Sequence, residues 1–218
     1  MAIREKVLGP VHPDVAESLG SLGELYYYMG DYGKTLSLWQ RTLAIREKVL
    51  GPEHTDTADT LNNLGLLYQS MGDYTKALPL QQRALASWEK VVGPEHALTT
   101  TGLNNLGLLY QAMGDYSNAL PPFQRTLAIR EKVFGPEHRN TANSLNNLAM
   151  LFYLMGDYAK ALPLYQRALV IWEKVLGPEH PAVAASLSNL AKLYRKTNRL
   201  DKAELLEQRA ARISSLKQ

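Results

Sequence analysis

The sequence contains no cysteine, so neither a disulfide framework nor thiol chemistry is available to it. No apolar run approaches the roughly 20 residues that a bilayer-spanning helix needs. The first residues, Met1 to Lys6, lack the apolar core and cleavage site of a signal peptide. Because a chain without cysteine also fits a reducing compartment, we expect a soluble protein with a cytoplasmic location and no membrane contact.

An excess of charge of either sign is missing too. The sequence has 24 lysines and arginines against 21 aspartates and glutamates, which leaves a formal net charge of +3. No block concentrates the basic residues into a patch, so nucleic acid is not an expected partner. With 45% hydrophobic and 21% charged residues the composition is that of an ordinary globular chain, and disorder is not expected.

Motifs for catalysis are absent as well. The sequence has no glycine-rich phosphate loop, nucleophile elbow or paired-histidine helix. Its histidines all occupy one repeated loop position, and equivalent atoms in successive packed helices should lie roughly 10 Å apart, whereas metal ligands converge within about 2 Å of one ion. We therefore expect no enzyme, no metal and no cofactor. We interpret the histidines as local hydrogen-bonding groups of loops: His12, His54, His96, His138 and His180.

What the sequence does contain is an internal repeat. Gly-Pro recurs every 42 residues, starting at Gly9, Gly51, Gly93, Gly135 and Gly177. Met-Gly-Asp-Tyr recurs with the same step at 29–32, 71–74, 113–116 and 155–158. Residues 51–92 and 93–134 share 28 identities in 42 positions, which indicates recent duplication. Differences between the repeats can therefore carry information.

The apolar pattern inside each repeat predicts two helices. Leu61, Leu64 and Tyr68 follow one another at steps of 3 or 4, and Ala77, Leu80 and the residues after them continue this spacing. A period near 42 also fits propeller blades and three-helix solenoids, but strand alternation is missing. We predict a helix A over about 56–70 and a helix B over about 74–92. The expected fold is all-α, a right-handed superhelical solenoid of antiparallel helix pairs.

We expect one solenoid over residues 1–218. Residues 1–8 repeat the end of a helix B, so we interpret them as a partial helix of a longer array, whose cut end offers a surface for self-association. The repeats are predicted at about 11–51, 53–93, 95–135, 137–177 and 179–216. The last one carries polar residues such as Lys202, Glu204 and Arg212, which a C-terminal cap requires.

Turn residues predict where each helix begins and ends. Gly51 is suited to the left-handed conformation that ends a helix B, and Pro52 blocks its continuation. Thr55 or Asp56 is expected to cap the next helix A. Gly30 and its equivalents allow the tight turn to helix B, which Asp31 and its equivalents cap. Prolines within helix B cost about 3 kcal/mol in an ordinary interior position, and we expect a small kink at each: Pro79, Pro121 and Pro163.

The pattern Leu61-x-x-Leu64-Gly65-x-x-Tyr68, followed by Gly72, Tyr74, Ala77 and Ala84, resembles the tetratricopeptide repeat consensus. The usual unit has 34 residues. The longer form with Leu-Asn-Asn-Leu in helix A and Ile-Arg-Glu-Lys in helix B resembles kinesin light chain repeats. It is closest to bacterial repeat proteins, whose arrays accompany regulatory NTPase or caspase-like domains. For function the resemblance implies binding of a peptide or protein.

Stacked A helices line the concave side of such a superhelix. Successive residues of an α-helix are turned by about 100°, so the residues opposite the packed face of helix A can be identified from the sequence. We expect these residues to line the groove. We predict peptide contacts from Tyr27, Asn62, Asn63, Gln69, Asn104, Asn105, Gln111, Asn146, Asn147, Met150, Tyr153, Asn189, Lys192 and Arg195.

The asparagines of this face allow two interpretations. Asparagine is a poor helix former, yet one stands at the same position of four repeats: Asn63, Asn105, Asn147 and Asn189. Its amide both donates and accepts, so the row can pair with the backbone of an extended peptide. Equally, the amides can pair with neighbouring A helices and fix the stacking. The adjacent Asn62 and Asn63 suggest one of each.

The lining also changes along the array, from acidic and tyrosine-rich to basic. Lys192, Arg195 and Lys196 predict a partner with an acidic end, although the same charges can simply solvate a terminal repeat. The leading hypothesis is a scaffold that binds an extended peptide or protein segment in the concave groove. The alternative is a sensing or self-association arm of a larger multidomain regulatory protein.

Overall fold

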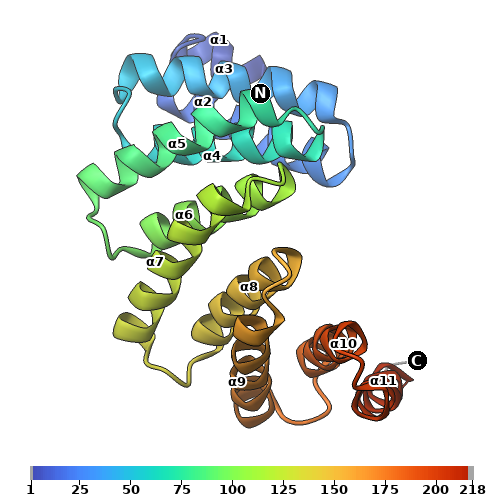
Figure 1. The fold of residues 1–218 in the computed structure, drawn as a ribbon. Helices are drawn as coiled ribbons and strands as arrows, with labels where there is room; N and C mark the ends of the chain where they lie inside the picture. The colour runs from blue at the N-terminus through green and yellow to red at the C-terminus, as the bar shows by residue number, and fades with distance from the viewer. Residues whose placement is uncertain (1, 216–218) are drawn as a thin grey trace. The chain divides into compact units, whose positions relative to one another are not determined.

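The computed structural model describes residues 2–215, and within this range it contains eleven α-helices and no strand (Figure 1). The helices are α1 (Ala2–Leu8), α2 (Pro13–Tyr28), α3 (Tyr32–Val49), α4 (Thr55–Ser70), α5 (Tyr74–Val91), α6 (Ala97–Ala112), α7 (Tyr116–Phe134), α8 (Arg139–Leu154), α9 (Tyr158–Leu176), α10 (Pro181–Lys196) and α11 (Leu200–Ser215). The chain divides into an N-terminal unit, Met1–Met113, and a C-terminal unit, Gly114–Gln218. The predicted all-α fold is confirmed.

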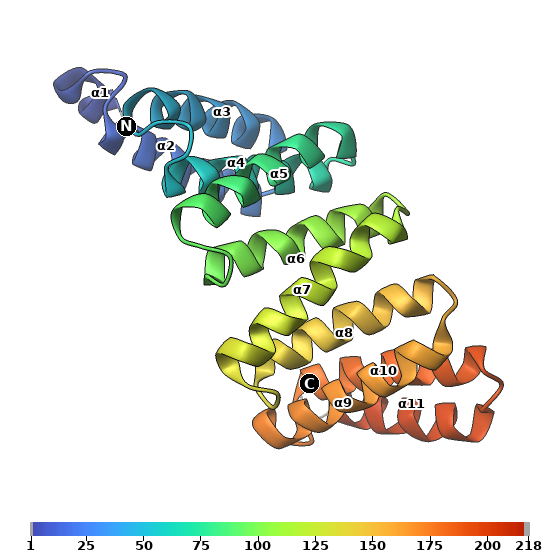
Figure 2. The same cartoon turned by 60° about the vertical axis from the view of Figure 1, so that its left-hand side comes forward.

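Each unit is built from antiparallel helix pairs. α2 packs on α3 and α4 on α5 in the N-terminal unit, while α8 packs on α9 and α10 on α11 in the C-terminal unit (Figures 1 and 2). We call α2, α4, α6, α8 and α10 the A helices. Every second helix, from α3 to α11, is a B helix. The prediction of one solenoid over residues 1–218 stays a prediction.

Histidine begins every A helix. The Nδ1 atom of His54 accepts a hydrogen bond at 3.1 Å from the backbone N–H of Asp56, and each of the other histidines makes the same contact at 3.1 or 3.2 Å. The prediction that the histidines bond locally is confirmed. The prediction that Thr55 or Asp56 caps the helix is wrong, because an imidazole nitrogen one or two positions earlier already takes the free N–H.

Aspartate caps the four B helices α3, α5, α7 and α9, as predicted. A carboxylate oxygen of Asp31 accepts from the backbone N–H of Lys34 at 3.1 Å, and Asp73, Asp115 and Asp157 repeat this contact. The hydrogen bond from the Lys34 side chain lowers the pKa of Asp31. Such a cap satisfies one of the donors that every helix start leaves free.

Glycine ends the B helices with positive φ, as predicted. Gly135 has φ 92° and ψ 163°, and Gly177 has φ 87° and ψ 154°. The large ψ means that the chain leaves in an extended direction and does not form the left-handed helical turn. This region of φ favours glycine strongly, because it has no Cβ. The helices also run through Pro79, Pro121 and Pro163, and the expected kinks stay a prediction.

Arginine at the end of a B helix fastens the next A helix. Nη1 of Arg46 on α3 donates to the Asp56 carbonyl and to the Thr60 hydroxyl of α4, both at 2.8 Å. Arg130 on α7 reaches the Ser144 hydroxyl of α8 at 2.9 Å. These charge-assisted bonds are half-buried, so they set the register of the two helices more firmly than a surface ion pair would.

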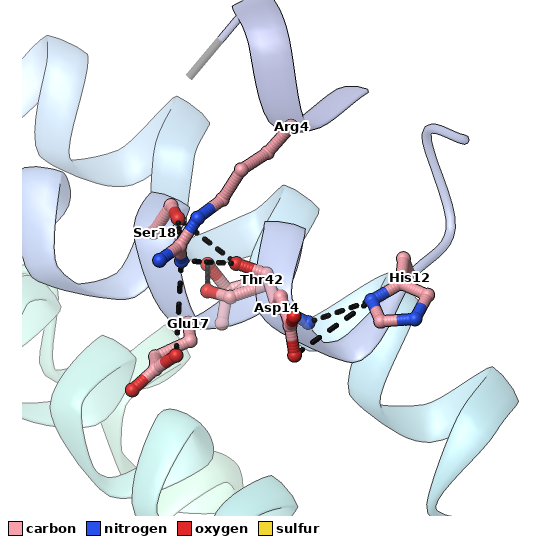
Figure 3. Close-up of polar contacts among 7 residues, drawn as sticks. Arg4, His12, Asp14, Glu17, Ser18 and Thr42 are labelled. Carbon is pink, nitrogen blue, oxygen red and sulfur yellow. Dashed lines mark hydrogen bonds and ion pairs between the residues drawn. The ribbon is translucent and has the colours of Figure 1, made fainter. Parts of the chain in front are cut away.

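Figure 3 shows the same contact at the start of the chain. Nη1 of Arg4 on α1 donates to the Ser18 hydroxyl at 2.7 Å and lies 3.8 Å from the Glu17 carboxylate, both on α2 (Figure 3). The hydroxyl of Thr42 on α3 approaches the Ala16 carbonyl of α2 at 3.5 Å. α1 is therefore joined to α2 by the contact that joins α3 to α4.

Tryptophan replaces this arginine in two B helices. Trp88 stands 42 residues after Arg46 in the sequence and is 2% exposed. Its ring fills the space beside Gly102 of α6, where a Cβ would lie 2.9 Å from two ring carbons. Its Nε1 donates to Asp59 at 3.1 Å. Burial raises the pKa of Asp59, and the bond from Trp88 opposes that rise. At this position of helix B, the repeats thus connect to the next A helix through either an arginine or a tryptophan.

Two glycines of α2 provide a matched test of this close packing. A Cβ on Gly23 would lie 2.5 Å from two atoms of the Trp39 indole, whereas a Cβ on Gly20 would lie 3.8 Å from Thr42 in ordinary contact. We expect Gly23→Ala to lower the free energy of unfolding by about 1–3 kcal/mol because the indole must move. Gly20→Ala should raise it by about 0.5–1 kcal/mol through helix propensity. Urea unfolding followed by circular dichroism measures both. A shift in the same direction for both variants would contradict the close packing of Trp39 on α2.

Candidate functional site

Asparagine pairs link successive A helices in both units. Nδ2 of Asn105 on α6 donates to Oδ1 of Asn62 on α4 at 3.0 Å. Nδ2 of Asn189 on α10 donates to Oδ1 of Asn146 on α8 at 3.2 Å. Asn62 is only 8% exposed, so its amide lies between the helices and does not face an open groove. These pairs correspond to the stacking interpretation, because a buried amide needs a partner.

Asn63 differs from its equivalents. It is exposed, and within the described residues its amide has no hydrogen-bond partner. The reason lies in the first repeat. Asn105 bonds to Asn62, which stands 43 residues earlier in the chain. The residue 43 positions before Asn63 is Gly20, and glycine has no side chain to accept a hydrogen bond. Asn104 and Asn147 do have interaction partners. Asn63 is thus left able to donate and accept hydrogen bonds.

An aromatic cluster covers the same face of the first repeat. The Tyr27 ring stacks on Trp39 with centroids 5.7 Å apart, and Tyr28 meets Tyr27 edge-on at 6.0 Å. The Tyr27 hydroxyl bonds to Ser70 on α4 at 3.1 Å, and Nε1 of Trp39 donates to the Gly20 carbonyl at 3.1 Å. Both rings are therefore held from their polar ends, while Tyr28 is 77% exposed.

Two adjoining cavities lie among these side chains. The first, about 200 Å³ in volume, is the aromatic pocket, lined by Glu24, Tyr27, Tyr28, Trp39, Asn63 and Leu66. The second, about 340 Å³, is the amide pocket, lined by Tyr27, Leu66, Gln69, Ser70, Tyr74, Asn105, Leu108 and Ala112. Tyr27 and Leu66 belong to both, so the pockets form one continuous surface over α2, α4 and α6.

The structure thus brings four of the predicted groove residues together in the N-terminal unit. Tyr27, Asn63, Gln69 and Asn105 line the two pockets. Gln69 is partly engaged, because its Oε1 accepts from Nε2 of Gln81 at 3.3 Å. Gln111 is half-buried, and its Oε1 accepts no hydrogen bond within the part of the chain that the structure describes.

Sequence reasoning missed Trp39 and did not include Leu66 among the predicted contacts. Trp39 lies on a B helix, which was not expected to reach the groove. It stands where the next repeat has Gln81, so a comparison of the repeats in helix B carries the signal. A large ring at this position, opposite Gly23, extends to the A-helix face and forms a wall of the aromatic pocket.

In the C-terminal unit most of the predicted contact residues are engaged with their own neighbours. The Tyr165 hydroxyl donates to Sδ of Met150 at 3.6 Å. Tyr153 lies with its ring centroid 5.5 Å from that of Tyr158. Burial, with a smaller contribution from Tyr153, raises the pKa of Tyr165. Met150 and Tyr153 therefore help to pack α8 against α9.

The basic end of the array is partly neutralised. Nε and Nη2 of Arg195 on α10 donate to the two carboxylate oxygens of Glu207 on α11 at 2.7 and 2.6 Å. This pair raises the pKa of Arg195 and lowers that of Glu207. Lys192 is exposed and has no ion-pair partner among the described residues. The positive charge left on this part of α10 comes from Lys192 and Lys196.

Other kinds of site find no support in the described part of the chain. Within residues 2–215, no three histidine, aspartate or glutamate side chains come together in a way that could hold a metal ion. None of the helices in that range combines the length and apolarity that crossing a membrane requires.

Helix pairs of this kind, stacked A on A and joined by short capped turns, define a helical-repeat protein of the interaction class. The model of the tetratricopeptide repeat family matches residues 21–90, 56–132, 99–169 and 140–215. The chain therefore belongs to the tetratricopeptide repeat family, whose members are scaffolds typical of protein–protein interaction and are generally not enzymes.

Solved structures agree with the family. The kinesin-light-chain-type, nearly identical TPR-like repeats of Podosopora anserina are 26% identical with a TM-score of 0.82, over 95% of this chain and 98% of that one. BtubC (BKLC) from P. vanneervenii is 25% identical with a TM-score of 0.83, over 99% and 85%. A Rap protein at 15% identity, with a TM-score of 0.72 over 90% and 53%, shares the fold alone. The curated proteins give no match.

The buried amide pair yields a prediction about stability. Asn62→Ala removes the acceptor of Asn105 and should lower the free energy of unfolding by about 1–2 kcal/mol. Asn63→Ala, one residue further, removes an exposed amide without a partner and should change it by less than about 0.5 kcal/mol.

A double-mutant cycle by urea unfolding separates the pair from other effects. Asn62→Ala and Asn105→Ala should show a coupling of about 1 kcal/mol. Additive losses would mean that the hydrogen bond contributes nothing to the stacking of α4 and α6.

Proposed function

We propose that the A-helix face of the N-terminal unit binds an extended segment of a partner protein along the aromatic and amide pockets. Asn63 carries the proposal, because it is an exposed amide that lines the aromatic pocket and has no hydrogen-bond partner among residues 2–215. Two walls of that pocket, Tyr27 and Trp39, are held by hydrogen bonds. The family supplies the general role of a scaffold. The lining of the two pockets indicates where the partner would bind and which side chains would contact it.

Asn63 supports recognition of a peptide backbone. An amide side chain can donate to a peptide carbonyl and accept from a peptide N–H together, whatever the peptide sequence. The Asn62 bond holds Asn105 in place through one of its N–H groups, which leaves its second N–H and its oxygen for a ligand. Asn62 therefore serves the stacking, and Asn63 serves the ligand.

The two cavities support recognition of side chains. At about 200 and 340 Å³ they lie at or below the small end of the range for small-molecule sites, roughly 300–1,000 Å³. Two adjoining small pockets along one face suit successive side chains of an extended segment better than one compact metabolite. A Rap protein that shares the fold has been solved in complex with Competence and Sporulation Factor.

A second contact is proposed in the C-terminal unit. The ammonium groups of Lys192 and Lys196 offer charge to an acidic stretch of a partner, and both residues are exposed on α10. Arg195 contributes less than the sequence suggested, because Glu207 already occupies its guanidinium group. The strength of this contact should fall with added salt, as it does for exposed charges.

Selection from a random peptide library displayed on phage tests the main proposal. We expect peptides that share a motif, bind with dissociation constants near micromolar, and lose about fivefold to tenfold in affinity for Asn63→Ala, the worth of one hydrogen bond. Fluorescence anisotropy with a labelled synthetic peptide measures this loss.

Gln40→Ala is the matched control, since it removes another exposed amide, on α3, that has no partner among the residues that the structure describes. Its affinity should equal that of the unchanged protein. The proposal fails if no motif emerges, or if Asn63→Ala and Gln40→Ala bind the selected peptide equally well.

A further inference from the structure

We propose that the aromatic pocket receives an arginine side chain of the partner, with Glu24 as its counter-ion. This inference rests on the proposed function and adds the chemical class of the bound side chain. It also gives the first repeat a role that the other repeats cannot share, because none of them has a carboxylate at the position of Glu24.

The charges of the A helices in the N-terminal unit point to a cation. α2, α4 and α6 together carry five carboxylates, namely Asp14, Glu17, Glu24, Asp56 and Asp59, and no lysine or arginine. Most of these acids already have a partner. Arg4 lies 3.8 Å from Glu17, the histidine caps lie near Asp14 and Asp56, and Trp88 donates to Asp59.

Glu24 is the exception. It is exposed on α2, and its carboxylate forms no ion pair or hydrogen bond within the described residues. It lines the aromatic pocket beside Tyr27 and Tyr28. A carboxylate without a counter-ion, at the edge of a cavity walled by aromatic rings, combines the two groups that a cationic side chain prefers.

The exposed Tyr28 ring offers a face to a flat cation, while Tyr27 and Trp39 already stack on each other. Tyr27 and Trp39 are nearly parallel, with 27° between their planes, and Tyr28 stands at 72° to Tyr27. A guanidinium group stacks on an aromatic face and binds a carboxylate through two parallel N–H groups. Lysine can make the charge contact but not the planar one. The pocket, about 200 Å³, has room for one long side chain.

The repeats provide an internal comparison. The positions of Tyr27 and Tyr28 are Gln69 and Ser70 in the second repeat, and the position of Trp39 is Gln81. The fourth repeat has Tyr153 and Tyr165 at the positions of Tyr27 and Trp39, but it has Met150 at the position of Glu24. The combination of aromatic rings with a carboxylate is therefore a property of the first repeat. Gly23 opposite Trp39 and the Ser70 bond to Tyr27 hold two rings in place before any ligand arrives, which reduces the entropy lost on binding.

Nuclear magnetic resonance of the full chain tests the inference with two synthetic probes, acetyl-glycyl-arginyl-glycinamide and its citrulline counterpart, which is neutral but nearly identical in shape. We expect the arginine probe to shift the Trp39 indole N–H signal saturably, with a dissociation constant of about millimolar. The citrulline probe should bind at least about fivefold more weakly.

Variants separate the charge of Glu24 from a general effect. Glu24→Gln should weaken the arginine probe about fivefold and leave the circular dichroism spectrum unchanged, because the carboxylate forms no ion pair or hydrogen bond within the described part of the chain. Glu17→Gln, at another exposed acid of the same helix, should leave the affinity as it was. Added salt should weaken the arginine probe and not the citrulline probe.

The inference is overturned if the Trp39 signal does not shift saturably, if both probes act alike, or if Glu24→Gln binds as well as the unchanged protein. Library peptides that depend on Asn63 but carry no arginine at a fixed position would also overturn it, while leaving the proposed function in place. Conversely, a saturable arginine-specific shift without any selected motif would support the pocket and count against binding of an extended peptide.

Discussion

Burial of helix against helix across repeats is the constraint on which the rest of this structure depends. Each A helix has sixteen residues, a length at which an isolated helix is only marginally stable in water. α4 is stabilised because it packs on α5 within its repeat and on α3 and α6 of its neighbours. Three local contacts set this packing: the histidine cap, the arginine or tryptophan at the end of helix B, and the amide pair between A helices.

The same constraint explains how a binding surface arises from near-identical repeats. Where the preceding repeat has an asparagine in reach, the amide bonds to it, as Asn105 bonds to Asn62. The first repeat has Gly20 at that position, so Asn63 is released. There too, Trp39 and Tyr27 stand where the second repeat has Gln81 and Gln69, and their rings form walls of the aromatic pocket. The candidate site thus lies where the first repeat differs in sequence from the others. A side chain that bonds to no neighbouring helix there is available to a ligand.

Much of the fold follows from the sequence because its signals are local and repeated. Spacing of Leu61, Leu64 and Tyr68 predicts helix A, and Asp31 predicts the start of helix B. The histidine cap was missed because imidazole is a rarer cap than threonine or aspartate, and only the position of Nδ1 decides between them. Whether Asn62 or Asn63 faces a ligand depends on contacts between helices some 43 residues apart, which periodicity along one helix does not determine. Trp39 was missed for the same reason.

Two adjacent asparagines are assigned different roles: Asn62 fixes the stacking of α4 and α6, and Asn63 binds the partner protein. Nuclear magnetic resonance of the side-chain amide groups, recorded while a library-selected peptide is added, tests this assignment most directly. We expect a large, saturable shift of the Asn63 Nδ2 signals together with the Trp39 indole signal, and a small one for Asn62. Shifts confined to the B helices, or equal shifts of Asn62 and Asn63, would contradict it.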